Sequence, residues 1–560
     1  MNNLDSTTND SELTLVKAVQ EGFLELCRQK IEIEGYDVNL LDSEGVSLLH
    51  WAAINDRREV VRYLLQKGAI YDRHCGEFDS TSLHWAVYRG HLHTIILLLR
   101  YGSDPYEEDN RGCNALHIAA QFGYPLLCIY FVEKCYMEVN TRDAFGITPL
   151  MWAVTSFTAV DTVRALSGLG ADLNLQDNNG LTALHWAVDK GKLKVVSELL
   201  ERGARIDIKD CSGLDAEAFS EGKKQKKITA FIKRWRFYKF SPLSKYQWLH
   251  RLILFVLPGV ALLANLLLVA ALPAIKAFIG IIAVWLLLAF TARAFWPLNG
   301  KKPFSFGIVV GTLTLLFVVF GVWLVPLNSE HDFLLIAFII SFYCCCHSLY
   351  LSWKCDPGFI REAEVIRLTE IITRAEEEKI GEAHVCYTCL LLKPTRSKHC
   401  SQCGECVRLF DHHCPFINNC VGGRNHRYFI GFLIFLPLGS YFYLCLCINY
   451  LRHTCMSADS KSVLSMQCLH AETVVCWAGL TAAFHGFWVF FMNLSQLYQI
   501  TVNLTTNEQV LLHARSVSYL QDANGKYTNK YDRGCWRNFT SFWTNRRLRE
   551  NYGDDQALQV

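Results

Sequence analysis

The chain lacks several features that would point to common protein classes. Its 55 Lys and Arg residues nearly balance 53 Asp and Glu residues, and a net charge of +2 gives no indication of a nucleic-acid partner. No cleavable signal peptide is expected, because residues 1–11 are polar and acidic. The 23 cysteines are spread along 560 residues, which excludes a small secreted disulfide scaffold. We therefore expect the main soluble parts to face the reducing cytosol.

Long apolar runs are present in place of these features. Hydrophobic residues make up 51% of the chain and the mean hydropathy is +0.15, which is high for a soluble protein. Six runs have about the 20 residues that a membrane-spanning helix needs. They lie at about 250–271, 273–296, 304–326, 331–353, 430–450 and 473–498. Lys and Arg are concentrated in the segments that six spans would place in the cytosol, so both termini are predicted there.

A short motif recurs every 33 or 34 residues before the first apolar run. Its copies are Leu48-Leu49-His50-Trp51-Ala52, Ser82-Leu83-His84-Trp85-Ala86, Ala115-Leu116-His117-Ile118-Ala119, Pro149-Leu150-Met151-Trp152-Ala153 and Ala183-Leu184-His185-Trp186-Ala187. This period and motif are those of ankyrin repeats, which pair two helices per copy and stack into a solenoid. Motif histidines are expected to bond backbone between repeats. The motif tryptophans could fill the core or contact a partner, and the sequence leaves both open.

The densest chemistry lies between Cys386 and Cys420, where seven cysteines and three histidines fall within 35 residues. Cys-x2-Cys pairs with nearby histidines suit tetrahedral zinc. Two such sites need eight ligands, so two of the ten candidates are left over. The surplus indicates reactive chemistry, although a structural zinc ribbon with one spare thiol remains the alternative.

This stretch resembles the cysteine-rich domain of the DHHC protein S-acyltransferases, with the complete core Asp411-His412-His413-Cys414. The resemblance implies one zinc ion on Cys386, Cys389, His399 and Cys406, and a second on Cys400, Cys403, His413 and Cys420. It leaves Cys414 as the nucleophile, His412 as its base and Asp411 as the partner of His412. A thiol reacts with a thioester as the thiolate, which a neighbouring histidine can generate and stabilise.

The resemblance also implies an acyl donor and supporting residues. Palmitoyl-CoA is the expected donor, with its phosphates on Lys393, Arg396 and Arg427, and its chain among the membrane helices. Thr505 and Thr506 are expected to support Asp411, and Asn538 to pack the tail against the site. One departure is Phe416, where the family usually has a tryptophan after the Cys-Pro pair, so a contact that orients the acyl group is in doubt.

The repeats narrow the resemblance to the huntingtin-interacting and yeast Akr-like ankyrin S-acyltransferases. In that subfamily an Asn and a Trp in successive repeats are implicated in binding a short linear substrate motif; the matching residues are Asn55 and Trp85. The predicted fold is helix-dominated, with an ankyrin solenoid, six membrane helices and a cytosolic zinc domain. Golgi or another endomembrane is the implied location, with membrane lipid and substrate proteins as partners and no nucleic acid.

The predicted boundaries follow from these assignments. They are a tail at 1–11, ankyrin repeats at 12–235, a basic linker at 236–249, four membrane helices at 250–353, the zinc domain at 354–429, two membrane helices at 430–498 and a cytosolic tail at 499–560. A luminal disulfide between Cys455 and Cys468 is a further hypothesis.

Two other classes of function deserve comparison. An ankyrin-bearing six-span cation channel would share the layout, but the 451–472 loop shows no selectivity filter and the fourth span has no regularly spaced Arg. A non-catalytic ankyrin adaptor would be expected to have a broken Asp-His-His-Cys core, whereas this core is intact. The sequence therefore favours a protein S-palmitoyltransferase.

Overall fold

The computed structural model describes residues 15–240, 247–272, 274–295, 303–328, 330–361, 364–377, 385–456, 472–513, 520 and 527–544. The predicted tail at 1–11 lies outside them. Contacts divide the chain into two compact units. The first contains residues 1–237 and 362–393; the second contains 238–361 and 394–560. We describe each unit by itself.

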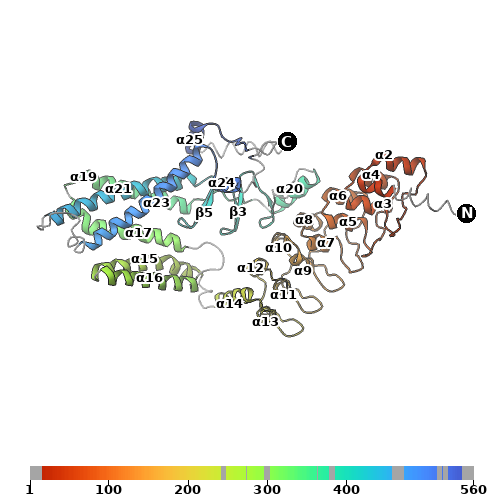
Figure 1. Ribbon diagram of the computed structural model, residues 1–560, viewed down its shortest axis with the longest axis horizontal. Helices are drawn as coiled ribbons and strands as arrows, with labels where there is room; N and C mark the ends of the chain where they lie inside the picture. Colours follow the sequence, from red (N-terminus) through yellow and green to blue (C-terminus); the bar gives the residue numbers. More distant parts are fainter. Residues whose placement is uncertain are drawn as a thin grey trace. The chain divides into compact units, whose positions relative to one another are not determined.

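The first unit is built from helix pairs, as the 33- or 34-residue period predicts (Figure 1). The first helices of the pairs are α3 (Leu48–Ile54), α5 (Ser82–Arg89), α7 (Ala115–Phe122), α9 (Pro149–Thr155) and α11 (Ala183–Asp189). The second helices are α4 (Arg58–Gln66), α6 (Leu92–Arg100), α8 (Pro125–Glu133), α10 (Ala159–Gly168) and α12 (Leu193–Glu201). The flanking elements are α2 (Leu24–Arg28), a π-helical turn (Gln29–Ile33), α13 (Ala216–Gly222) and α14 (Lys226–Phe240).

The motif histidines explain how the first helices begin. Thr81 caps α5 by accepting a hydrogen bond from the backbone N–H of His84, and the His84 ring accepts one from the Thr81 N–H in return. This capping box satisfies donors that a helix start would leave unpaired. The other ring nitrogen of His84 lies 3.0 Å from the carbonyl oxygen of Glu107, in the next repeat. His50 contacts the Ser80 carbonyl at 2.9 Å in the same way, so the expected backbone contact between repeats is confirmed for these two histidines. Nε2 of His117 and Nε2 of His185 are buried and make no hydrogen bond to the described residues.

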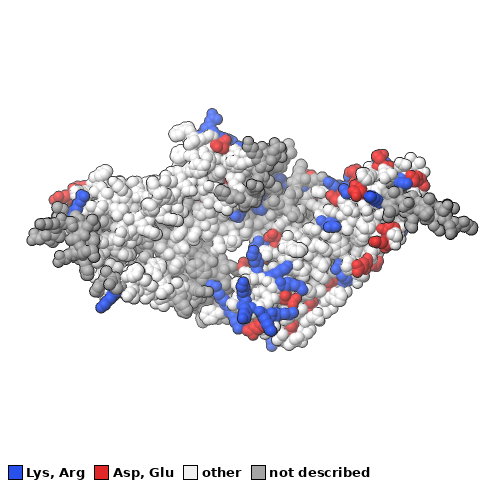
Figure 2. Space-filling view, viewed as in Figure 1, with Lys and Arg blue, Asp and Glu red and all other residues white. Residues whose placement is uncertain are grey.

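The second unit contains long apolar helices. They are α15 (Gln247–Ala271), α16 (Ala274–Phe295), α17 (Phe304–Val319), α19 (Asp332–Lys354), α21 (His426–Met456) and α23 (Thr473–Thr501), and a π-helical turn (Phe320–Leu324) joins α17 to α18 (Val325–Leu327). Figure 2 shows their surface almost without charge, whereas Lys and Arg gather over α13 and α14. A helix that is apolar on its exposed side suits lipid rather than water.

Five of these helices are long and apolar enough to cross a membrane, counting the described residues only. They comprise 251–271, 304–327, 332–354, 426–455 and 473–501, while the apolar part of α16 covers only Lys276–Ala289. Five spans are thus found where six were predicted, and the second predicted span is a shorter apolar helix. Cys455 forms a disulfide; its predicted partner Cys468 lies outside the described residues.

Short hairpins carry the cysteine-rich sequence. The strands are β1 (Val385–Cys386), β2 (Leu391–Leu392), β3 (Lys398–Cys400), β4 (Glu405–Val407), β5 (His412–Cys414) and β6 (Asn419–Val421), and they pair in order as three antiparallel hairpins. Helix α20 (Glu364–Glu376) precedes them, and α24 (Thr506–His513) and α25 (Cys535–Trp543) follow α23.

Candidate active site and metal groups

The side chains of the three residues of β5 point to two different faces of the strand, because side chains alternate along a strand. His412 and Cys414 are two residues apart and point to one face, while His413 points to the other. His413 pairs directly with Cys420 across the β5–β6 hairpin, and His399 pairs with Cys406 across β3–β4. Each hairpin thus sets a histidine opposite a cysteine, and each of these pairs belongs to one predicted metal group.

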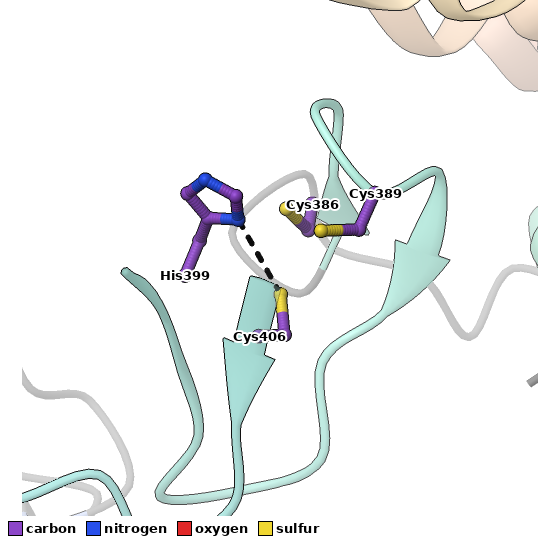
Figure 3. Close-up of side chains that lie close together, drawn as sticks. All are labelled: Cys386, Cys389, His399 and Cys406. Atoms are coloured by element: carbon purple, nitrogen blue, oxygen red, sulfur yellow. Dashed lines mark hydrogen bonds between the residues drawn. The ribbon is translucent and has the colours of Figure 1, made fainter. Parts of the chain in front are cut away.

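The structure brings together both predicted sets of ligands. One group is Cys386, Cys389, His399 and Cys406 and the other is Cys400, Cys403, His413 and Cys420; the ligand atoms of each lie within 4.8 Å of one another. Figure 3 shows the first group, in which the Cys406 sulfur lies 3.9 Å from His399 Nδ1. The β-hairpins therefore assemble the ligands that the resemblance implied.

The second group has the separations that zinc requires. His413 Nδ1 lies 3.5 Å from the sulfurs of Cys400 and Cys403 and 3.6 Å from that of Cys420. The Cys403 and Cys420 sulfurs are 3.4 Å apart. Tetrahedral zinc with bonds of about 2.0–2.3 Å sets its ligands roughly 3.3–3.8 Å apart. The ligand sets of three thiols and one imidazole also suit zinc, so these residues fit that ion.

Cys414 and His412 are the two candidates left over. Cys414 is buried and packs in an apolar cluster with Leu349 of α19 and with Phe429 and Leu433 of α21. The nucleophile predicted from the sequence is therefore in contact with side chains of the apolar helices. A thiol in this position can receive a group that is soluble in the membrane.

His412 is held as a partner for Cys414. Its Nδ1 lies 2.7 Å from Asp411 Oδ2, and its ring meets Phe429 edge-on. Burial by itself lowers the pKa of His412, but hydrogen bonds to Asp411 and Cys414 outweigh burial and raise the pKa to about 10. The imidazole thus readily accepts a proton and then presents a positive charge to the sulfur of Cys414.

Asp411 is fixed by α24, the helix that contains the last three residues of the Thr505-Thr506-Asn507-Glu508 motif. Thr506 donates two hydrogen bonds of 2.8 Å, from its backbone N–H to Asp411 Oδ1 and from its hydroxyl to Oδ2. Burial alone would raise the pKa of Asp411, but the bonds to His412 and Thr506 hold it well below its usual range. Thr505 instead exchanges hydrogen bonds with Glu508 and so fixes the first turn of α24.

Sequence reasoning missed three residues that contact this network. Gln499 of α23 is buried, and its side-chain oxygen accepts hydrogen bonds from the Thr506 hydroxyl at 3.0 Å and from Gln496 at 3.1 Å. Gln496 of α23 donates to Asp411 Oδ2 at 3.3 Å and to the Thr506 hydroxyl at 2.9 Å. Its carbonyl oxygen lies 2.8 Å from His426 Nε2, and both side chains are buried. A buried polar side chain inside an apolar helix needs partners, and that signal applies to both Gln496 and Gln499. None of the three residues belongs to a recognisable motif.

The β5–β6 hairpin and the segment after it are attached to the end of α19 by amide side chains. Asn419 donates to the carbonyl oxygens of Trp353 and Cys355, and Asn425 donates to that of Ser352. These are carbonyl groups at the C-terminus of a helix, which have no partner within the helix. The same two side chains therefore cap α19 and fix the hairpin on it.

The predicted phosphate contacts differ in their surroundings. Arg396 is buried and makes two hydrogen bonds of 2.7 Å to Glu508, and its guanidinium stacks on Tyr531 at 4.5 Å. Lys393 and Arg427 are half-buried, and Arg427 donates to the Tyr428 hydroxyl. The charge of Arg396 is already paired, so its surroundings favour a structural role over binding a phosphate.

Two further predicted residues lie nearby. Asn538 of α25 is buried; its amide donates to the carbonyl oxygen of Thr501 at the end of α23 and to Asp532, both at 2.7 Å. The tail is therefore fixed to the helix that carries Gln496. Phe416 is 44% exposed, and its ring offers no hydrogen-bond donor.

The four motif tryptophans are not equivalent. Trp51, Trp152 and Trp186 each donate the indole N–H to an aspartate nine residues earlier, at 2.7–3.0 Å. Trp85 has Gly76 at that position, and its N–H makes no hydrogen bond to any residue that the structure describes. Its ring packs edge-on against His50 and Trp51. Trp85 is thus the half-buried motif tryptophan whose donor remains available.

Asn55 lies one turn after Trp51, at the end of α3. Its side chain is exposed, and its amide donates to the carbonyl oxygen of Trp51 at 2.8 Å. It therefore lies in the repeat whose tryptophan contacts Trp85.

Comparisons with known proteins show the family of this chain. Residues 379–512 match the family model for the DHHC palmitoyltransferase, and residues 15–109, 83–177 and 116–210 match ankyrin repeats. The chain is 34% identical over 549 residues to palmitoyltransferase ZDHHC17 of Danio rerio, covering 94% of this chain and 87% of that protein. The chain is 32% identical to human palmitoyltransferase ZDHHC13, and the match covers 96% of this chain and 87% of that protein. It is 34% identical to palmitoyltransferase Hip14 of Drosophila melanogaster, and that match covers 89% of this chain and 81% of that protein. On these matches, the chain belongs to the DHHC palmitoyltransferase family.

Proposed function

We propose that this protein S-palmitoyltransferase works through Cys414 in two displacements. The observation that carries the proposal is the arrangement of Cys414 and His412 on one face of β5, with His412 bonded to Asp411. In the first step, His412 takes the thiol proton and the Cys414 sulfur attacks the carbonyl carbon of the acyl-CoA thioester. The bond to the coenzyme A sulfur breaks, and that sulfur receives the proton from His412.

The second displacement reverses these roles. The thiol of a substrate cysteine gives its proton to His412 and attacks the acyl carbonyl on Cys414. The Cys414 sulfur leaves, recovers the proton, and the substrate carries the thioester. One histidine can serve both steps because its pKa is raised by Asp411 and its charged form is stabilised there.

The acyl chain would lie among the membrane helices. Cys414 packs with Leu349 and Leu433, and a small cavity between α17, α19, α21 and α23 is lined by apolar side chains such as Leu313 and Phe342. A chain attached to Cys414 would thereby leave water, at about 0.8 kcal/mol per buried CH₂. The number of methylene groups that fit would set the preferred acyl length.

The phosphates of coenzyme A are assigned to Lys393 and Arg427. Cations pair with phosphate through charge-assisted hydrogen bonds, and both side chains are partly exposed. Arg396 remains in the proposal only as the residue that fixes Glu508 and hence α24.

Two zinc ions are assigned to the two ligand groups. Bound zinc would hold the hairpins together, since zinc binding and folding of such small domains are coupled. His413 and Cys420 then fix β5 from one face, leaving His412 and Cys414 on the other to react.

The membrane arrangement and recruitment of substrates extend the proposal. We assign six spans, counting α16 as the second, with both termini, the repeats and the zinc domain in the cytosol of a Golgi or related membrane. Asn55 and Trp85 are assigned to a short linear motif of substrate proteins. The support is the indole N–H of Trp85, which makes no hydrogen bond to the described residues, whereas the other motif tryptophans donate theirs to an aspartate.

One experiment tests the chemistry. The purified protein is incubated with labelled palmitoyl-CoA, and we expect hydroxylamine-sensitive label on Cys414. Cys414→Ser should abolish that label and acylation of substrates while retaining the metal content of the parent protein, because a hydroxyl is a far weaker nucleophile than a thiolate. Label that persists on another cysteine, or loss of one metal ion in the variant, would refute the assignment of Cys414.

A further inference from the structure

Helix α8 is apolar on all sides, which a second helix of an ankyrin repeat does not require. Its residues Pro125 to Phe131 are all buried. Helix α4, at the same place in an earlier repeat, buries Val60, Val61 and Leu64 but exposes Glu59 and Arg62. A helix buried all round needs partners on both sides. The neighbouring repeats supply one side only.

The second side is covered by a segment more than 200 positions later in the chain. Leu126 and Ile129 of α8 and Ala165 of α10 form an apolar cluster with Leu368 and Ile371 of α20. This cluster is separate from the core of the repeats and belongs to the same compact unit. Ile129 and Ile371 are fully buried in it. The outer side of α8 is therefore a docking surface that α20 occupies.

The sequence of α20 is suited to this position. Its buried residues Leu368, Ile371 and Ala375 recur at helical spacing, while Thr369 and Thr373 are exposed on the other face. At its end, Glu376 pairs with Lys134 at 3.2 Å and accepts a hydrogen bond from the Tyr130 hydroxyl. Apolar and polar contacts thus agree on one register of α20 on the repeats.

The hairpin that follows α20 uses the same surface. Val385 and Leu390, on either side of Cys386 and Cys389, are buried in the cluster. Leu390 reaches Gly168 at the end of α10 so closely that a Cβ there would lie 3.0 Å from its side chain. Two ligands of the first metal group are therefore carried by a segment that packs on the ankyrin repeats.

We infer that the ankyrin stack is a structural support of the first metal group, in addition to any role in binding substrates. The face formed by α8 and α10 holds α20 and the β1–β2 hairpin, and thereby restricts where the sulfurs of Cys386 and Cys389 can lie. Metal affinity depends on how far the ligands are ordered before binding. The repeats thus raise the affinity of this group for zinc. The inference uses the proposed zinc site but not the proposed acyl transfer.

The test replaces one buried residue of α20 in the full-length protein. Ile371→Asp places a charge in the cluster, while Thr373→Asp adds the same charge to the exposed face of the same helix. We expect hydrogen exchange of residues 364–377 and 385–392 to accelerate at least about tenfold in Ile371→Asp only. Zinc, measured by mass spectrometry after dialysis against a mild chelator, should fall by about one equivalent per chain in that variant.

Ile129→Asp provides the reciprocal test from the ankyrin side, because Ile129 lies outside the core of the repeats. It should give the same exchange and zinc loss while α3 and α5 stay protected. Unchanged exchange of 364–392 in both variants would overturn the docking. Accelerated exchange with full zinc retention would overturn the support of the metal group. Either result is obtained without an acylation assay, so failure here is distinct from failure of the proposed function.

Discussion

Replacing single motif tryptophans with phenylalanine should separate recognition from stability. Trp152→Phe removes the N–H that bonds to Asp143 Oδ2 at 2.9 Å and leaves a buried carboxylate without that donor. A hydrogen bond to a charged group contributes about 1.5–3 kcal/mol. Trp85→Phe removes an N–H that bonds to no described residue and keeps an aromatic ring against His50 and Trp51. It should cost less than about 1 kcal/mol of stability.

Binding should show the opposite order. If the Trp85 N–H donates to a substrate peptide, its removal should weaken binding by about 1–2 kcal/mol, or roughly 5- to 30-fold. Trp152→Phe should leave the affinity near that of the parent protein. The assay is fluorescence anisotropy with a labelled peptide from an acylation substrate of the ankyrin-bearing relatives. Stability of the repeats is read from hydrogen exchange in the full-length protein, where Trp152→Phe should accelerate exchange by about 10- to 150-fold.

Two results would refute this reasoning. If Trp85→Phe and Trp152→Phe accelerated hydrogen exchange equally, Trp85 would be a core residue that stabilises the repeats. Unchanged peptide affinity in Trp85→Phe would show that its N–H is not used. Asn55→Ala supplies an independent check, because the exposed Asn55 amide donates to the carbonyl oxygen of Trp51 in α3. This variant should weaken binding of the peptide without accelerating hydrogen exchange of α5.

Three other predictions concern the catalytic site and the repeats. His413→Ala should lose about one zinc ion per chain, whereas His412→Ala should keep both and slow self-acylation; identical behaviour would contradict the alternation along β5. Thr506→Ala removes one bond to Asp411 and should slow self-acylation about tenfold or more at unchanged zinc content, measured by rapid-quench labelling. Burial lowers the pKa of His50, His84 and His117 to about 4. Because protonation then favours the unfolded state, ankyrin stability should be full above pH about 6.5 and fall by about 2 kcal/mol per histidine at pH 5; a flat profile by denaturant unfolding would contradict this.

Local sequence determined the features that could be predicted. The ankyrin helices follow from a repeated motif, because His84 and Thr81 make the same capping box that recurs in other copies. The metal groups follow because His399 and His413 each lie seven residues before the cysteine that they face across a hairpin. In both cases the partners are a few residues apart, so spacing alone implies contact.

Contacts between distant segments could not be predicted in this way. Gln496 reaches Asp411 over 85 positions and Glu508 pairs with Arg396 over 112, and neither pair has a spacing that identifies it. The resemblance to the family assigned Arg396 to a phosphate of coenzyme A. In the structure, that charge balances a buried glutamate that no local pattern relates to it.

The docking of α20 illustrates what the sequence nevertheless contains. The apolar run from Pro125 to Phe131 is unusual for a second ankyrin helix, and the spacing of Leu368, Ile371 and Ala375 gives α20 one apolar face. Each pattern indicates an apolar surface that must be covered, but neither pattern identifies the segment that covers it. An amphipathic helix just before a metal-binding hairpin could have packed on many surfaces. Only the fold shows that α8 and α20 cover one another, and that the segment carrying Cys386 and Cys389 packs on the same face of the repeats.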